Sequence, residues 1–370
     1  MITRYVFSHP EGDIPVTPVE AQRPLKMDTE KDHPFLTLGD YFQAIETVFL
    51  RHQYFFQQQG RTPIESLIIR SEKHGGLYHV VCLEVSFHLN RLKYGLLTAV
   101  SRMAKRWLVQ EYETITLLNK SLNPSFLPQT FFIDRVDHRR GNQAETLKMA
   151  LVEWFEDYHE WHVSMDPGSG QGYGLRLWDQ KKGKRLLADH ETFEIFRQAS
   201  RILILYYNAE SGNAISHWHH AAGDFIIQIK DDQIDVKLTA ARRYEPFITP
   251  GEGIHPSVGL LYIFLDLTIR MRLDRWDGVG ETVWMDDVVL KGTIRGFFDA
   301  LMEKEAAGTL RVMSIRDFIE LLKVFSKDEF RKMFNPLMNF YHTENLKEYV
   351  VIKENLDKHI EVLYQQIQII

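Results

Sequence analysis

The sequence predicts an α+β protein of two lobes, in which a five-stranded antiparallel sheet with one helix precedes a mostly helical lobe. Three observations lead to this class. Short β-branched and aromatic runs crowd between residues 64 and 155, helical periodicity dominates from residue 189 onward, and a Gly-rich stretch separates the two regions. The expected domains are an N-terminal arm and helix (1–60), a β-rich lobe (61–165) with a hinge near 153–172, and a helical lobe (173–370).

The composition is that of a folded protein. Of the 370 residues, 44% are hydrophobic and 25% are charged, which argues against a largely disordered chain. The net charge of −6 argues against a nucleic-acid partner. Cys82 is the single cysteine, so no internal disulfide forms. The N-terminus lacks the apolar core of a signal peptide, and Asp266 interrupts the most apolar run, so we expect a cytoplasmic protein without a membrane span.

The first 60 residues predict an extended arm and one helix. Residues 1–36 are rich in Pro, Asp and Glu and show no clear periodicity. Thr37 is the expected N-cap of a helix, with Asp40 in its first turn. Apolar residues then recur at helical spacing, and Gly60 predicts that the helix ends near Gln59.

The β-rich lobe is predicted from five β-branched or aromatic runs and one helical segment. Gly75 and Gly76 predict a turn between the first two strands. A Gly-containing stretch, 166–172, marks the most flexible part of the expected hinge. The expected strands are 66–70, 77–85, 94–100, 127–133 and 147–155, and the expected helix is 104–120.

The second lobe is predicted from helical periodicity interrupted by two strand pairs. A hairpin-like piece begins at residue 175, and a second hairpin turns at Asp231-Asp232. The expected helices are 189–208, 256–275, 286–305, 314–324, 327–341 and 344–368.

A histidine-rich segment, 216–229, lies between the helix 189–208 and the second hairpin. It reads Ser-His-Trp-His-His-Ala-Ala-Gly-Asp-Phe-Ile-Ile-Gln-Ile, with His217 at its start and Asp224 before the apolar run. The order of elements resembles a protein-kinase-like fold. The segment resembles the catalytic loop of the lipopolysaccharide kinase (Kdo/WaaP) family, H-R-D-x-x-x-x-H/N-F-L-L, and is more loosely similar to the aminoglycoside phosphotransferase loop H-G-D-x-x-x-x-N. Residues 238–242 lie where the first family carries I-D-L-x-R, and Arg242 matches its basic position.

The resemblance implies roles for particular residues and also shows a degenerate motif. His219 stands where the family has the aspartate that accepts the proton of the attacking hydroxyl, and Thr239 replaces a metal-binding aspartate. His219 and His217 are therefore the candidate catalytic residues, and Asp224 and His220 are the candidate metal ligands. Residues 96–101, where the resemblance places a phosphate-binding lysine, contain none, so Lys93 is a candidate nucleotide contact. Glu111 and Glu113 are candidates for the helix glutamate that would pair with it, and Glu153 is a further candidate nucleotide contact.

Three functions remain open on these residues. The first is a pseudokinase-type binding or regulatory protein that keeps a nucleotide or another small ligand between its lobes, or binds a protein partner. The second is an active, atypical small-molecule or glycolipid phosphotransferase that uses ATP and Mg²⁺ with His219 and Asp224. The third is a histidine-rich metal-binding protein, with Zn²⁺ held by the loop histidines and Asp224. A fourth interpretation gives these histidines no chemistry, only hydrogen bonds that brace the lobe.

Overall fold

The computed structural model describes the chain except for residues 29–30, 167, 169–171, 180–182, 221–222 and 249–254. The described residues divide into two compact units, Met1–Asp157 and Tyr158–Ile370, and both helices and strands contribute to the fold. The division falls within the predicted hinge, 153–172, of which residues 167 and 169–171 lie outside the described part. The first 60 residues pack into the first unit together with the β-rich region.

In the described part of the first unit, seven strands form one mixed sheet in the order β2-β1-β5-β6-β7-β9-β8. The five predicted strands are present and pair antiparallel with one another, but the sheet has seven strands, so the predicted number was wrong. The predicted arm supplies β1, which pairs parallel with β5, and β2, which pairs antiparallel with β1. The strands are β1 (Ile2–Phe7), β2 (Ile14–Pro15), β5 (Ile64–His74), β6 (His79–Phe87), β7 (Arg91–Ala99), β8 (Thr130–Arg140) and β9 (Gln143–Glu153).

The extra strand β1 has a local signal that the surrounding composition obscures. Its six residues are rich in β-branched and aromatic types, and burial alternates along its first four positions. Val6 is buried and Tyr5 packs against the main core. The residues that follow β1 are rich in proline and acidic types, so the region as a whole was predicted as an extended arm and this strand was missed. The antiparallel pair β3 (Pro24–Lys26) and β4 (Asp32–Thr37) was missed in the same region.

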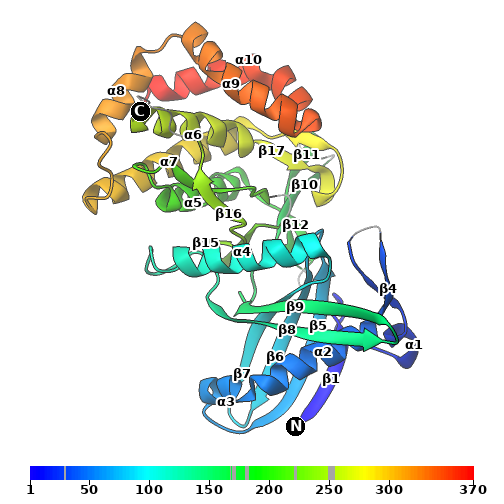
Figure 1. The fold of residues 1–370 in the computed structure, drawn as a ribbon. Helices are drawn as coiled ribbons and strands as arrows, with labels where there is room; N and C mark the ends of the chain where they lie inside the picture. Colours follow the sequence, from blue (N-terminus) through cyan, green and yellow to red (C-terminus); the bar gives the residue numbers. More distant parts are fainter. Residues whose placement is uncertain (29–30, 167, 169–171, 180–182, 221–222, 249–254) are drawn as a thin grey trace. The chain divides into compact units, whose positions relative to one another are not determined.

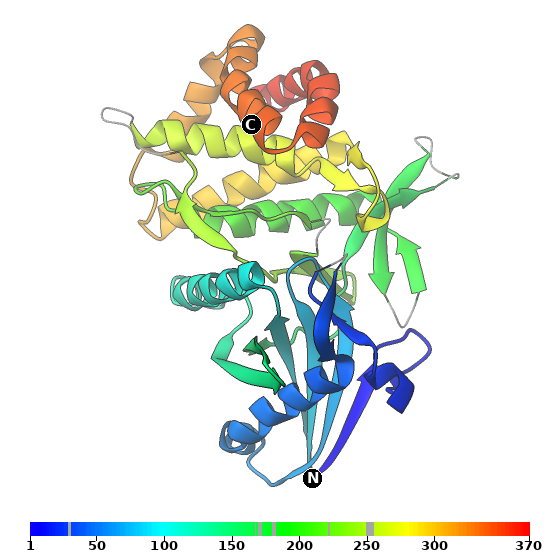
Figure 2. The same ribbon diagram turned by 45° about the vertical axis from the view of Figure 1, so that its right-hand side comes forward.

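Helices cover both faces of the sheet (Figures 1 and 2). On one face, α2 (Leu38–Arg51) and α3 (Gln53–Gly60) contribute Tyr41, Phe49 and Phe56 to the main core. On the other face, α4 (Arg102–Leu118) packs Leu108 against the sheet. A short helix, α1 (Pro18–Ala21), precedes β3.

Local capping sets the start of α2, and a tertiary contact accompanies its end. The Thr37 side chain accepts from the backbone N–H of Asp40, and the Asp40 carboxylate accepts from the Thr37 backbone N–H, which confirms the predicted cap. The single helix predicted to Gln59 divides at His52, where φ is −101° and ψ is 17°. The His52 ring stacks on Phe132 with a centroid distance of 3.8 Å.

The second unit is built on two closely packed helices, α5 (Asp189–Tyr206) and α7 (Asp287–Ala306). Gly292 and Gly296 of α7 lie against the α5 backbone. A Cβ atom at Gly296 would lie 1.9 Å from the carbonyl oxygen of Arg197, and one at Gly292 would lie 2.5 Å from that of Phe193. Any larger side chain would separate the two helices, so glycine at these positions permits their close contact.

The remaining elements of the second unit surround this pair, and Figure 2 shows several helices stacked together. β10, β11 and β12 pair in a small antiparallel sheet, and the hairpin predicted around Asp231-Asp232 is confirmed as β14 and β15. The strands are β10 (Trp161–Met165), β11 (Tyr173–Asp179), β12 (Gly183–Leu186), β13 (Asn213–Ser216), β14 (Phe225–Lys230), β15 (Gln233–Leu238), β16 (Arg243–Pro246), β17 (Leu273–Arg275) and β18 (Thr282–Trp284). The other helices are α6 (Pro256–Arg270), α8 (Ile315–Val324), α9 (Lys327–Glu344), α10 (Leu346–Gln368) and the 3₁₀ turn η2 (Trp276–Gly278). Within the described ranges, no helix combines the length and the apolar character needed to cross a membrane.

Candidate functional site

The histidine-rich loop joins two strand pairs of the second unit. It follows β13, which pairs with β16, and it precedes β14, which pairs with β15. Residues 221–222 of the loop lie outside the described part. Gly223 has a φ of +73°, and a Cβ atom there would lie 2.4 Å from a carboxylate oxygen of Glu160. The left-handed backbone favours glycine immediately before Asp224, whereas the Glu160 carboxylate ends a flexible side chain that can move aside.

A buried ion pair between Asp224 and Arg242 holds the end of the loop. Arg242 donates from Nη1 to Asp224 Oδ2 and from Nη2 to Oδ1, each at 2.6 Å. The backbone N–H of His219 donates to Oδ2 at 2.8 Å. Only 3% of the Asp224 side chain is exposed. Both oxygens of this carboxylate are thus engaged by protein donors in a bidentate, charge-assisted pair.

Thr239 occupies the position that the resemblance assigns to a metal-binding aspartate. Its hydroxyl donates to the carbonyl oxygens of Gly223 and Asp224, at 3.0 and 3.2 Å, and its backbone N–H donates to the Asp224 carbonyl at 2.7 Å. The side chain therefore ties β15 to the loop, and its hydroxyl proton points to carbonyl groups of the loop.

His219, the candidate proton acceptor, lies in a mostly buried position. Its Nε2 is 3.8 Å from Oε1 of Glu348, and its ring lies 5.3 Å from that of His220. Burial, reinforced by the charge of His220 and of nearby arginines, lowers the pKa of His219 well below its usual range. At neutral pH the imidazole is consequently neutral and a poor acceptor of a proton.

His217 takes part in the hydrogen bonds of the loop through its backbone carbonyl, which binds Arg242. It has a φ of 60°, in the left-handed region, and its carbonyl accepts from Arg242 Nη1 at 2.8 Å. Half of its side chain is exposed, and Nε2 lies 3.9 Å from Oε1 of Glu245. Burial, followed by the charge of Arg243, lowers the pKa of His217.

His220 faces a buried acid that sequence reasoning missed. Its Nδ1 lies 3.8 Å from Oδ1 of Asp274, and both side chains are almost fully buried. Asp274 accepts from the backbone N–H groups of Val163 and Arg275, at 3.1 and 2.7 Å. Burial raises the pKa of Asp274 and lowers that of His220, although each group opposes the shift of the other. The available signal was one carboxylate inside the otherwise apolar and basic run 271–276.

These donors do not fit the metal that the resemblance implies. Across the described residues, no group of three or more His, Cys, Asp or Glu side chains is arranged to hold a metal ion. Asp224, the carboxylate proposed for Mg²⁺, would have to exchange its bonds with Arg242 for the metal. His162 also lies near His220, and its Nε2 is 3.3 Å from Oε2 of Glu160. A zinc site at the loop histidines stays a prediction.

The candidate nucleotide contacts lie in the first unit and are dispersed. Lys93 on β7 forms an ion pair with Glu156. Glu111 is buried on α4, whereas Glu113 is exposed on the same helix. Glu153 ends β9, and its carboxylate accepts from the backbone N–H of Gln129 at 3.1 Å. The expected pairing of a strand lysine with a helix glutamate is thus replaced by a pairing of Lys93 with Glu156.

Comparison with models of known protein families gives no match, and no curated protein matches the sequence.

Proposed function

We propose that this chain is a kinase-like protein of the pseudokinase type, which acts by binding or regulation and does not transfer phosphoryl groups. The observation that carries the proposal is the ion pair between Asp224 and Arg242. Phosphoryl transfer depends on metal ions and positioned groups that neutralise charge at the transferred phosphate. Here the loop carboxylate is neutralised by an arginine of the same unit, so it is not available for that task.

Two further observations support a degenerate site. His219, which stands where the resemblance places a catalytic aspartate, has a lowered pKa because it is buried, so it holds a proton weakly. Thr239, which stands where a metal-binding aspartate is expected, donates its hydroxyl to loop carbonyls. The kinase-like part of the proposal is supported by the order β5, β6, β7, α4, β8 and β9, although β1 and β2 join the same sheet and β10, β11 and β12 precede α5.

The proposal is tested by measuring ligand binding and phosphoryl transfer separately. Thermal-shift titrations with ATP, with and without Mg²⁺ or Zn²⁺, report binding, and release of γ-phosphate from labelled ATP reports transfer. We expect no Mg²⁺-dependent turnover, and any stabilisation by ATP should be independent of Mg²⁺. Absence of an ATP shift would remove nucleotides from the candidate ligands. Mg²⁺-dependent turnover that disappears in His219→Ala, but persists in the exposed control His88→Ala, would refute the proposal and establish an active phosphotransferase.

A further inference from the structure

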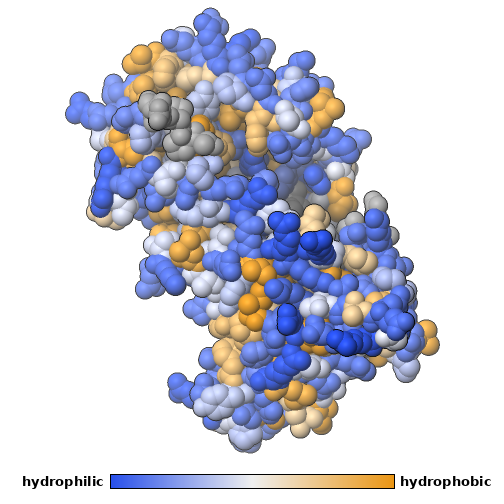
Figure 3. Space-filling model, in the orientation of Figure 1, coloured by the Kyte–Doolittle hydropathy of each residue, from blue (hydrophilic) through white to orange (hydrophobic). Residues whose placement is uncertain are grey.

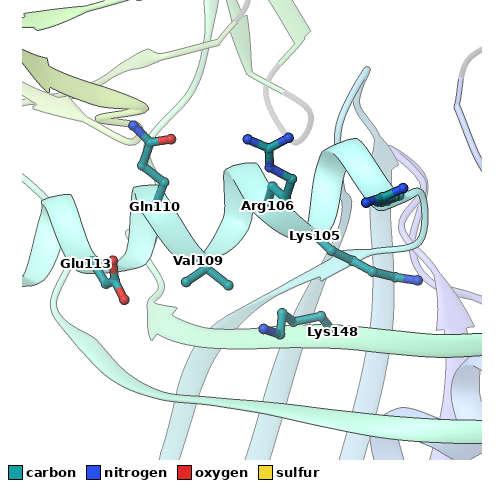
Figure 4. Close-up of a pocket in the computed structure, with 7 residues that line it drawn as sticks. Lys105, Arg106, Val109, Gln110, Glu113 and Lys148 are labelled. Atoms are coloured by element: carbon teal, nitrogen blue, oxygen red, sulfur yellow. The ribbon is translucent and has the colours of Figure 1, made fainter.

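A cationic hollow lies beside α4 and β9, in the first unit. Its volume is about 440 Å³, and Figure 4 shows its lining side chains on α4 and β9. Lys105, Val109 and Glu113 extend toward the side of Lys148, whereas Arg106 and Gln110 point away from that strand. The complete lining is Arg102, Lys105, Arg106, Val109, Gln110, Glu113 and Lys148. Figure 3 shows strongly hydrophilic side chains over the N-terminal end of α4.

The positive charge of the hollow is largely uncompensated. Lys105 pairs with Glu145. Among the residues that the structure describes, no carboxylate lies within ion-pair distance of Arg102, Arg106 or Lys148. The whole chain has a net charge of −6, so this concentration of cations is not a consequence of a basic composition.

Two features show that this arrangement has a cost in the free protein. Arg102 and Lys105 lie in the first turn of α4, which contains no acidic residue, and cations near a helix N-terminus oppose its dipole. Lys148 pairs directly across the β8–β9 ladder with Arg135, so two like charges share one face of the sheet. A bound anion would offset both repulsions.

We propose that this hollow binds the phosphate groups of a phosphorylated small molecule. Arginine guanidinium groups match phosphate oxygens in bidentate geometry, and lysine supplies a compact positive charge. A volume of about 440 Å³ suits a small ligand. Val109 offers an apolar contact, and Glu113 offers an acceptor for a hydroxyl group next to the phosphate.

This inference does not rest on the proposed function. The hollow lies within Met1–Asp157, whereas the loop that carries the proposed function lies within Tyr158–Ile370. Loss of phosphoryl transfer and loss of phosphate binding are therefore separate outcomes, detected by separate assays.

The test is calorimetric titration of the full chain with inorganic pyrophosphate and with ADP. We expect saturable binding, weakened at least about tenfold in Lys105→Gln/Lys148→Gln because two cations on the same side of the hollow are lost. The matched control is Arg23→Gln/Lys120→Gln, which removes the same charge from exposed positions of the same unit and should bind like the wild type. Glu113→Gln should weaken binding of ADP and leave binding of pyrophosphate unchanged.

A second measurement separates binding from folding. Lys148→Gln relieves the repulsion by Arg135, so its melting temperature in the absence of ligand should equal or exceed that of the wild type. A lower melting temperature would assign Lys148 a structural role and count against the proposal. The proposal would be overturned if neither pyrophosphate nor ADP bound saturably, or if the control pair of substitutions weakened binding equally. Binding of single-stranded DNA without binding of pyrophosphate or ADP would likewise overturn it, because the surface would then recognise a polyanion.

Discussion

Replacement of Arg242 by methionine removes the partner of a buried carboxylate while keeping a side chain of similar length. Asp224 would keep only the hydrogen bond from the His219 backbone N–H. Its side chain is only 3% exposed, so the carboxylate would be left buried without its ion-pair partner. Breaking a buried pair in this way costs about 3–5 kcal/mol. Arg242 is 22% exposed, so water can reach the vacated position, and we expect a value near the lower end, about 3 kcal/mol.

The reverse change should be milder. Asp224→Asn leaves the partly exposed guanidinium of Arg242 in contact with solvent, so we expect a loss of about 1–2 kcal/mol. The double variant should lose less than the sum of the two single losses, with a coupling of about 1–3 kcal/mol. Arg331→Met is the control, because Arg331 pairs with Asp357 at 2.9 Å with both side chains exposed, and an exposed pair contributes at most about 1 kcal/mol.

Urea unfolding followed by tryptophan fluorescence is a suitable assay, because five of the seven tryptophans lie in the second unit. The midpoint and slope give the change in the free energy of unfolding for each variant. A loss in Arg242→Met no larger than in Arg331→Met would refute the reasoning, as would strict additivity in the double variant. Either outcome would mean that Asp224 is solvated and free to take another ligand.

Two further predictions concern stability. His219, His220 and His359 have lowered pKa values because they are buried, so they stay neutral in the folded chain and take up protons on unfolding. Their contribution to stability should therefore fall by about 1.4 kcal/mol per histidine for each pH unit between about 6.5 and the lowered pKa of that histidine in the folded chain, partly offset by Asp274, whose pKa is raised. Denaturation at several pH values gives the slope of the free energy of unfolding against pH, and this slope should correspond to one proton fewer in His359→Leu than in the wild type. An unchanged slope would show that His359 does not contribute to the pH dependence. Gly296→Ala would force α5 and α7 apart and should cost about 1–3 kcal/mol, whereas Gly76→Ala, with open space around the new methyl group, should change stability by less than about 0.5 kcal/mol in the same denaturation experiment.

Much of the secondary structure followed from local signals. The Thr37–Asp40 cap, the turn at Asp231-Asp232 and the helical periodicity of the second unit all depend on residues a few positions apart. Such interactions act whatever the rest of the chain does, so the sequence predicted most helices close to their observed bounds.

Tertiary structure decided the features that join distant segments. β1 pairs with β5 across about sixty residues, which extends the sheet from the five predicted strands and makes it mixed. Asp224 meets Arg242, which lies between β15 and β16, and His220 meets Asp274 of β17. The sequence by itself determined that the loop carries histidines and one carboxylate. Whether that carboxylate is offered to a ligand or held by an arginine depends on which segments pack together, because the partner of a buried charge comes from any part of the chain that the fold brings within bonding distance.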